Sequence, residues 1–358
     1  MASFSFVERS PTGNECKRSV VFEFDLRQRE FLRDVPLNGA HKWMFLDVFE
    51  DGPANVAGIR PGDILDTLDG TACMPPVTPC FAIGQTHTLG VCKRGAVSRN
   101  EIVIEVPMRK GTKQRPPIVE PKSPIQAKMG SNIGLLKIPY FPGAMGMGFA
   151  NALDAAVDNL KQQGCERLII DLRGNIGGSL GFARLASYMC PDQIPIGHSL
   201  TPRRLRDGYD SETLPRVPMP RSRPELLFTL TRFAFRDKSV MLLTQGLAAQ
   251  PFHKRIVALV NEWTNSAAEM VANFAAENRL ATIVGQKTRG NVLGAANFKA
   301  GGGSWLRLPV FGWFTSKGRT LEGNGVDPDV LVEVSPDALA AGKDSQMTRA
   351  IEIVSGMQ

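Results

Sequence analysis

The amino-acid sequence predicts an α/β domain preceded by a β-rich module. Residues 20 to 110 alternate short β-rich runs with turn signals, whereas residues 131 to 340 alternate apolar strands with helical patterns. The phrase GTKQRPPIVEPKSPIQ separates them, is rich in proline and charge, and holds almost no residue for a core. We therefore expect a linker over residues 111 to 130, an N-terminal tail over 1 to 19, and a C-terminal helix or tail over 341 to 358.

The composition of the 358-residue chain is that of a globular protein, with 43% hydrophobic residues and no apolar run long enough to span a bilayer. A formal net charge of +7 is compatible with nucleic-acid binding, but aromatic residues make up only 7%. The basic residues are also scattered, apart from one cluster at Arg203, Arg204 and Arg206. We therefore expect no nucleic-acid partner and no integral membrane segment.

The six cysteines form no CxxC pair and have no histidine at metal-ligand spacing. Reduced thiols are therefore expected, with no metal and no cofactor. The N-terminal residues lack the basic-then-apolar plan of a signal peptide, so a cytoplasmic location is expected for the chain as written. A periplasmic or otherwise exported location is the alternative if the natural start lies upstream.

The β-rich module is centred on DGPANVAGIRPGDIL, residues 51 to 65. Its glycines and prolines predict a turn, a short helix over residues 54 to 57, a second turn and a strand that begins at Ile64. Further strands are expected in VVFEF, WMFLDVF, HTLGVCKRG and EIVIEVP.

The α/β domain repeats a strand, helix, strand order. IGLLKIPYF and ERLIIDLRG flank a helix over residues 150 to 162, and IVALVNE and ATIVGQKT flank a helix over residues 266 to 278. Strands that are apolar on successive residues are usually covered on both faces, as in a parallel sheet. Residues 201 to 224 are dense in arginine and proline, and we expect an exposed excursion there.

Candidate chemistry first appears in DLRGNIGG, which directly follows a predicted buried strand. Gly177 and Gly178 could let backbone N–H groups point at an anion or an oxyanion, or the segment could be only a turn.

Ser266 lies at a predicted strand-to-helix junction in NEWTNSAAE. Its more common role there would be an N-cap, and the alternative is a nucleophile whose oxyanion is held partly by the next amide. Glu322, in LEGNGVDPDV, is either a solvated turn carboxylate or a group that orients a catalytic partner.

Taken in order, these segments resemble the C-terminal processing peptidases, also called tail-specific proteases. DGPANVAGIRPGDIL is similar to a phrase of the family's PDZ-like module, and the later segments follow in the family's order over about residues 40 to 335. The resemblance implies a crotonase-like peptidase domain behind a PDZ-like domain. It also implies acyl transfer to serine and then to water on protein or peptide substrates, whose C-terminal tails the PDZ-like module would capture. A homo-oligomer is compatible with it.

The resemblance also assigns residues. Ser266 matches the nucleophile, and the amide of Ala267 with the Gly177-Gly178 turn matches the oxyanion hole. Glu277, eleven residues after the serine, matches a supporting acidic or amide residue. The general-base lysine of the family should stand in a TFGKG-like phrase, but TRGNV places Asn291 there. An asparagine side chain cannot accept the proton of a serine hydroxyl.

Three explanations of Asn291 remain open. Another base could act, as in relatives of tricorn type, which use a histidine from an N-terminal segment and a glutamate that Glu322 would match. The protein could instead be a pseudoprotease that binds tails without cutting, or it could retain partial activity from the oxyanion hole and a carboxylate. Lys287 is interpreted as a solvated loop charge. The chain has four histidines, His41, His87, His198 and His253. Of these, His87 and His253 are expected to be structural.

Overall fold

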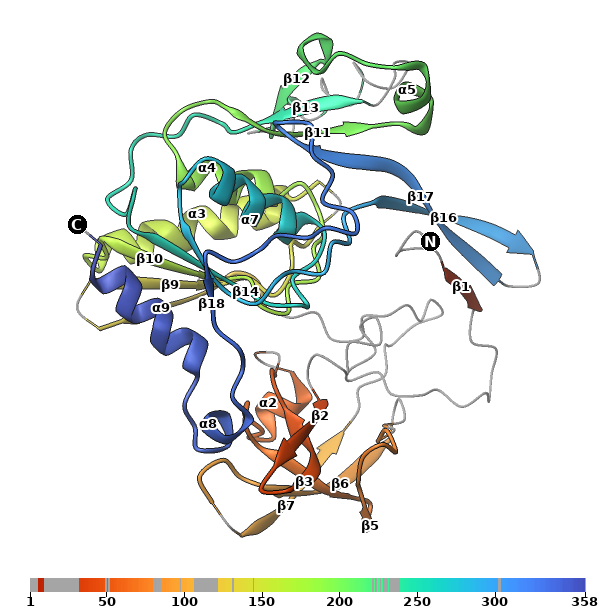
Figure 1. Cartoon of the computed structure of the whole chain (residues 1–358), viewed down its shortest axis with the longest axis vertical. Helices are drawn as coiled ribbons and strands as arrows, with labels where there is room; N and C mark the ends of the chain where they lie inside the picture. The colour runs from red at the N-terminus through yellow and green to blue at the C-terminus, as the bar shows by residue number, and fades with distance from the viewer. Residues whose placement is uncertain are drawn as a thin grey trace. The chain divides into compact units, whose positions relative to one another are not determined.

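The computed structural model describes residues 6–9, 32–105 and 122–357, without 49, 51, 80, 82–84, 97, 131, 144, 221, 223, 226, 228–230, 232–238, 302 and 303. The chain forms two compact units (Figure 1). The larger unit comprises Met1–Ser10, Ser123–Val332 and Arg349–Gln358, and the smaller unit comprises Pro11–Lys122 and Glu333–Thr348.

Several predicted segments lie outside the described residues: the strand VVFEF, most of the tail over 1 to 19, and residues 111 to 121 of the linker. Inside the predicted linker, Ile125–Met129 forms strand β8, which pairs antiparallel with β9 (Ile133–Lys137). The other predicted domain boundaries, at residues 19, 110 and 340, remain predictions.

The smaller unit contains one sheet with the strand order β2-β3-β4-β6-β7, and β5 pairs with β4. The predicted short helix is α2 (Pro53–Val56). The strands are β2 (Leu32–Leu37), β3 (Ala40–Phe45), β4 (Ile64–Leu68), β5 (Thr71–Ala72), β6 (Thr86–Cys92) and β7 (Arg99–Glu105).

The C-terminal segment Glu333–Thr348 completes the core of the smaller unit. Helix α8 (Pro336–Ala340) places Leu339 against Met44 in a buried apolar cluster. Gly62 has a φ of 93°, and a Cβ there would lie 2.1 Å from the carbonyl oxygen of Leu339, so only glycine allows this approach.

The larger unit is built on a sheet with the order β18-β15-β14-β10-β9-β8, which is parallel except for β8. The apolar runs of the sequence form its central strands, as predicted. Besides β8 and β9 it contains β10 (Arg167–Asp171), β14 (Ile256–Val260), β15 (Thr282–Gly285) and the two-residue β18 (Val330–Leu331).

A second sheet of the larger unit has the order β1-β17-β11-β13-β12, and β16 pairs with β17. Its strands are β1 (Phe6–Arg9), β11 (Pro195–Leu200), β12 (Arg216–Pro218), β13 (Val240–Leu243), β16 (Gly294–Gly301) and β17 (Ser304–Thr315).

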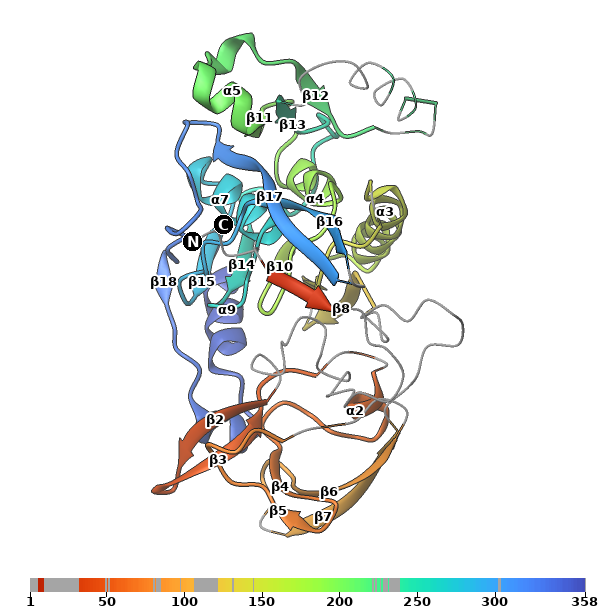
Figure 2. The same cartoon turned by 90° about the vertical axis from the view of Figure 1, so that its right-hand side faces the viewer.

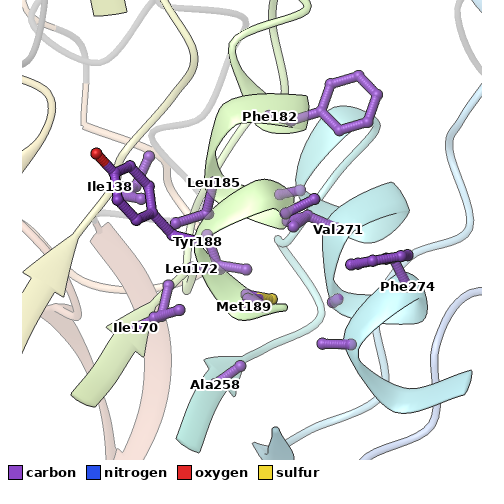
Figure 3. Packing of buried hydrophobic residues seen from close by; sticks show 14 of the residues in the cluster. Ile138, Ile170, Leu172, Phe182, Leu185, Tyr188, Met189, Ala258, Val271 and Phe274 are labelled. Atoms are coloured by element: carbon purple, nitrogen blue, oxygen red, sulfur yellow. The ribbon is translucent and has the colours of Figure 1, made fainter. Parts of the chain in front are cut away.

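Three helices lie on one face of the main sheet: α3 (Met147–Gln162), α4 (Phe182–Met189) and α7 (Ala267–Glu277) (Figures 1 and 2). Helix α7 contacts α4, strand β15 of the main sheet and strand β11 of the second sheet, so it lies between the two sheets. Side chains of α4 and α7 point toward Ile170 and Ala258 of the main sheet (Figure 3). Helix α9 (Ser345–Ser355) ends the chain, and its carbonyl oxygen at Val354 accepts a hydrogen bond from Arg167.

The predicted excursion over residues 201 to 224 is exposed in part. Helix α5 (Pro202–Asp207) has no buried residue, but β12 joins the second sheet, and Leu214 and Met219 are buried. A few scattered apolar side chains in an arginine-rich segment were too weak a pattern to predict this sheet edge. Among the described residues, no helix is long and apolar enough to cross a membrane.

Helix α7 offers a direct test of the packing. Phe274 is fully buried between helices and sheet, so Phe274→Ala is expected to lower the free energy of unfolding by about 3 to 5 kcal/mol, measured by urea denaturation. Leu205→Ala on α5, where the leucine is 51% exposed, is the control and should change stability by less than about 0.5 kcal/mol. Equal losses would contradict the packing described for α7.

Candidate active site

Three loops meet at one edge of the main sheet. Strands β10, β14 and β15 are adjacent and parallel, so the segments that follow Asp171, Val260 and Gly285 all leave from the same edge. In open α/β sheets this carboxyl edge is where ligands bind. The glycine turn, Ser266 and Asn291, which the sequence places far apart, all belong to these three segments.

Ser266 immediately precedes helix α7 and has φ 53° and ψ −119°. An N-cap residue normally has extended φ and ψ, and a positive φ is uncommon for any residue with a side chain. Strained backbone of this kind concentrates at functional sites, and a serine on a sharp strand-to-helix turn is typical of nucleophiles. Ser266 is therefore at the predicted junction, in a conformation that favours the nucleophile over a simple cap.

Gly177 lies directly against Ser266. A Cβ at Gly177 would be 2.5 Å from the Cβ of Ser266, 3.0 Å from its Oγ and 3.1 Å from the nitrogen of Ala267, and the φ of Gly177 is 85°. Only glycine permits this contact, both in space and in backbone conformation. The structure thus brings together the two motifs that the sequence predicted separately.

One of the predicted oxyanion donors, the N–H of Gly177, already has an acceptor. The N–H of Gly177 donates to Oδ1 of Asn175 at 2.7 Å, so it is occupied. The N–H groups of Gly178 and Ala267 donate to no residue in the part of the chain that the structure describes. Gly177 therefore provides the close approach, and Gly178 and Ala267 are the candidate donors.

Asn175 joins the glycine turn to the serine, and the sequence reasoning missed it. The residue is fully buried, and its Nδ2 donates to the carbonyl oxygen of Ile138 at 2.5 Å. Its own carbonyl oxygen accepts the N–H of Asn265, the residue before Ser266, at 2.7 Å. Asparagine is common in glycine-rich turns such as this one. The local sequence around Asn175 therefore did not indicate these tertiary hydrogen bonds.

Asn261 and Thr264 join the loops after β10 and β14. Oδ1 of Asn261 accepts the N–H of Gly174 at 2.9 Å, and Oγ1 of Thr264 donates to the carbonyl oxygen of Leu172 at 2.8 Å. Thr264 is fully buried, so this bond is shielded from water.

The DLRG half of the DLRGNIGG segment has a structural role. Arg173 donates to both carboxylate oxygens of Asp171, at 2.9 and 2.8 Å. Burial alone would raise the pKa of Asp171, but the charge and hydrogen bonds of Arg173 hold this pKa below its usual value.

Glu269 is the second residue that the sequence reasoning missed. Its carboxylate is fully buried, and both oxygens act only as acceptors. Oε2 accepts the N–H groups of Ser266 and Asn291 at 3.0 and 2.9 Å, and Oε1 accepts the Thr288 hydroxyl and the Gly290 N–H, each at 2.6 Å. Burial raises the pKa of Glu269, and the four hydrogen bonds oppose the rise. The available signal was the capping-box spacing S-x-x-E from Ser266 to Glu269.

Asn291 lies beside the serine turn, where the resemblance placed the general base. Its Nδ2 donates to Oδ1 of Asn265 at 3.3 Å. Oε2 of Glu322 accepts the N–H of Val292 at 2.8 Å and that of Leu293 at 3.3 Å. Glu322 therefore anchors the backbone that follows Asn291, and no hydrogen bond joins it to Ser266.

Glu277 is not brought to this site. It is the last residue of α7, and a helical rise of 1.5 Å per residue puts it roughly 16 Å from Ser266. Its carboxylate accepts a hydrogen bond of 3.5 Å from the hydroxyl of Ser316.

The histidines have other partners. His87, on β6 as predicted, contacts Asp69 at 2.7 Å, and His253 contacts the carbonyl oxygen of Tyr188 at 3.1 Å. His198 stacks on Phe314, and His41 is exposed on β3. Within the described ranges, no histidine or lysine nitrogen hydrogen-bonds to Ser266, and no three His, Cys, Asp or Glu side chains are placed to hold a metal ion.

Comparison with known proteins decides the family. The model described as Peptidase family S41 matches residues 132–332, more than half of the chain. The chain belongs to peptidase family S41. The matched range contains all three segments of the site, and the resemblance to C-terminal processing peptidases is confirmed.

Two curated S41-like relatives show how much of the chain is shared. The chain is 24% identical over 297 residues to a probable CtpA-like serine protease of Staphylococcus haemolyticus, covering 81% of this chain and 50% of the relative. It is 24% identical over 321 residues to the carboxyl-terminal-processing protease of Synechocystis sp., covering 85% and 63%. The chain therefore spans less than two thirds of the length of either relative.

A solved structure shares the fold. A putative S41 protease from Bacteroides fragilis matches with a TM-score of 0.64 and 18% sequence identity, covering 99% of this chain and 86% of that one. The predicted fold class is confirmed as an S41 peptidase fold of mixed α/β content with a β-rich N-terminal region.

The contact between Gly177 and Ser266 can be tested by adding one methyl group. Gly177→Ala meets two obstacles, a positive φ and a contact of 2.5 Å with the Cβ of Ser266, whereas Gly164→Ala meets only the positive φ of 74°, with nothing within 4 Å. Gly164→Ala should lose about 1 kcal/mol in the free energy of unfolding, and Gly177→Ala at least about 1 kcal/mol more. Equal losses of unfolding free energy in the two variants, measured by urea denaturation, would show that Gly177 is not in close contact with Ser266.

Glu269→Gln tests the acceptor role of the buried carboxylate. Glutamine has nearly the same shape but must turn an NH₂ group toward two donors, so we expect a loss of about 1 to 3 kcal/mol in thermal or urea unfolding. Glu277→Gln, on the same helix, is the control, because Glu277 has a single long hydrogen bond from a hydroxyl group. A Glu269→Gln protein as stable as the control would contradict the four-donor arrangement.

Proposed function

We propose that this protein is a serine-type endopeptidase that acts on protein or peptide substrates, with Ser266 as the nucleophile. The observation that carries the proposal is the strained serine turn packed against Gly177, with the N–H groups of Gly178 and Ala267 free of described acceptors. Membership of peptidase family S41 supports the same conclusion.

The proposed reaction is acyl transfer. Oγ of Ser266 attacks the scissile carbonyl carbon, and the N–H groups of Gly178 and Ala267 stabilise the negative charge that develops on the carbonyl oxygen. Collapse of the tetrahedral intermediate breaks the C–N bond, and the amine half of the substrate leaves with the proton that the serine hydroxyl gives up. Water then adds to the acyl-enzyme, which releases the acyl half as a carboxylic acid and returns a proton to Oγ of Ser266. Glu269 does not take part in bond making in this proposal, because it holds the backbone of Ser266 and of Asn291 in place.

We further propose that the smaller unit is a PDZ-like domain that captures substrate tails, and that the larger unit is of crotonase-like type. The smaller unit has a five-strand path with edge strands at β2 and β7, and it carries the phrase DGPANVAGIRPGDIL around α2. An extended tail can add to such an edge by main-chain hydrogen bonds.

A peptide-binding scaffold without turnover is the second candidate. It is favoured by Asn291, whose side chain lies beside the serine turn but cannot act as a base. In this second candidate the fold and the proposed tail-binding module are kept, and Ser266 is not activated.

A fluorophosphonate probe separates the two candidates. If the protein is a peptidase, we expect covalent labelling of Ser266, detected by mass spectrometry of the peptide that contains it, and no labelling of Ser266→Ala. Because Asn291 lies beside Asn265, Asn291→Lys should place an amine close to the hydroxyl and raise the labelling rate by roughly 100-fold.

Absence of labelling in the folded wild-type protein would favour the scaffold. In that case Ser266→Ala should bind peptides with free C-termini as tightly as the wild type does. Labelling of the wild type that survives in Ser266→Ala would show that another residue is the nucleophile.

A further inference from the structure

Arg289 and Trp263 form a cation–π pair in the loops of the candidate site. The Cζ atom of Arg289 lies 4.5 Å from the centroid of the Trp263 ring, a cation–π distance. Arg289 is exposed, and in the described part of the chain no carboxylate pairs with it. By contrast, Lys287 in the same loop is 2.9 Å from Asp327. One of the two cations of this loop is therefore neutralised, and the other is not.

The pair is connected to the serine turn by a short chain of hydrogen bonds. The carbonyl oxygen of Trp263 accepts Nδ2 of Asn265 at 2.9 Å, and Oδ1 of Asn265 accepts Nδ2 of Asn291 at 3.3 Å. Trp263 is three residues before Ser266, and Arg289 is two residues before Asn291. The guanidinium is thus presented by the same two loops that hold the nucleophile.

The backbone on both sides of Arg289 is held in place. The Thr288 hydroxyl and the Gly290 N–H donate to Glu269, and the carbonyl oxygen of Gly290 accepts the N–H of Gly323 at 2.8 Å. An arginine whose flanking backbone is fixed and whose guanidinium already contacts an aromatic ring loses less conformational entropy when it binds a ligand.

We propose that Arg289, held against Trp263, binds a carboxylate of the substrate at the candidate site. The guanidinium carries five N–H donors, so contact with one aromatic ring leaves donors that can pair with both oxygens of a carboxylate. The carboxylate is either the C-terminal group of a chain or the side chain of an aspartate or glutamate. The inference rests on the proposed function, and it makes Arg289 a specificity-determining residue of the same site.

The test is a binding measurement in Ser266→Ala protein, which does not depend on turnover. Four pentaalanine-based peptides carry an N-terminal fluorescein: one with a free C-terminal acid, one with a C-terminal amide, and two amidated forms with glutamate or glutamine as the last residue. Fluorescence anisotropy gives the dissociation constants. We expect at least one acidic peptide to bind about tenfold or more tightly than its neutral partner, and the peptide pair that differs identifies the source of the carboxylate.

Three variants in the Ser266→Ala background assign the effect. Arg289→Gln should abolish the preference for the acidic peptide, and Arg289→Lys should retain part of it because the charge remains but the planar group with its paired N–H donors is lost. Lys287→Gln removes one positive charge from the same loop and is the matched control, so the preference should survive in it.

Equal binding of acidic and neutral peptides, or no binding of any of them at millimolar concentration, would overturn the proposal. A preference that falls equally in Arg289→Gln and Lys287→Gln would also overturn it, because it would reflect general positive charge and not one contact. Failure of the peptidase function shows instead as absent fluorophosphonate labelling, so the two failures are distinguishable.

Discussion

The buried carboxylate of Glu269 joins the two loops on which the candidate site depends. It accepts the N–H of Ser266 from one loop, and the Thr288 hydroxyl with the N–H groups of Gly290 and Asn291 from the other. A buried carboxylate is costly unless its lone pairs are satisfied, so this group is stable only while both loops keep these positions. The strained conformation of Ser266 is held by the same bonds, since its N–H is one of the four donors.

A second set of bonds attaches the glycine turn. Asn175 is bonded to Ile138, Gly177 and Asn265, so the segments after β9, β10 and β14 form one frame. All three strands are parallel and adjacent, and the frame only has to link their ends. The main sheet and helix α7 thus set the approximate place of each loop, and buried polar side chains set the final contacts.

The sequence predicted the elements of this frame better than its connections. Apolar runs identified β9, β10, β14 and β15, and helical spacing identified α3 and α7, because burial on both faces of a parallel sheet leaves a clear pattern. Ser266, the glycine turn and the place of position 291 were found because ordered motifs resembled a known family.

The missed residues share a physical cause. Asn175, Asn261 and Glu269 act through hydrogen bonds to backbone groups that are distant in the chain, and such bonds leave no periodicity in the sequence. Glu322 was found as a residue, but its partners are backbone N–H groups of Val292 and Leu293 and not a catalytic side chain. The edge strand β12 was missed because the segment around it is dominated by arginine and proline.

At position 291 the backbone and the side chain have different roles. Its backbone N–H is one of the four donors to Glu269, so this part of the residue belongs to the frame whatever the side chain is. The side chain makes one hydrogen bond among the described residues, a long one of 3.3 Å to Asn265. A change from lysine to asparagine there removes a proton acceptor without removing a bond on which the frame depends. The frame can therefore persist with either side chain, and the chemical role of the site depends on atoms that the fold does not require.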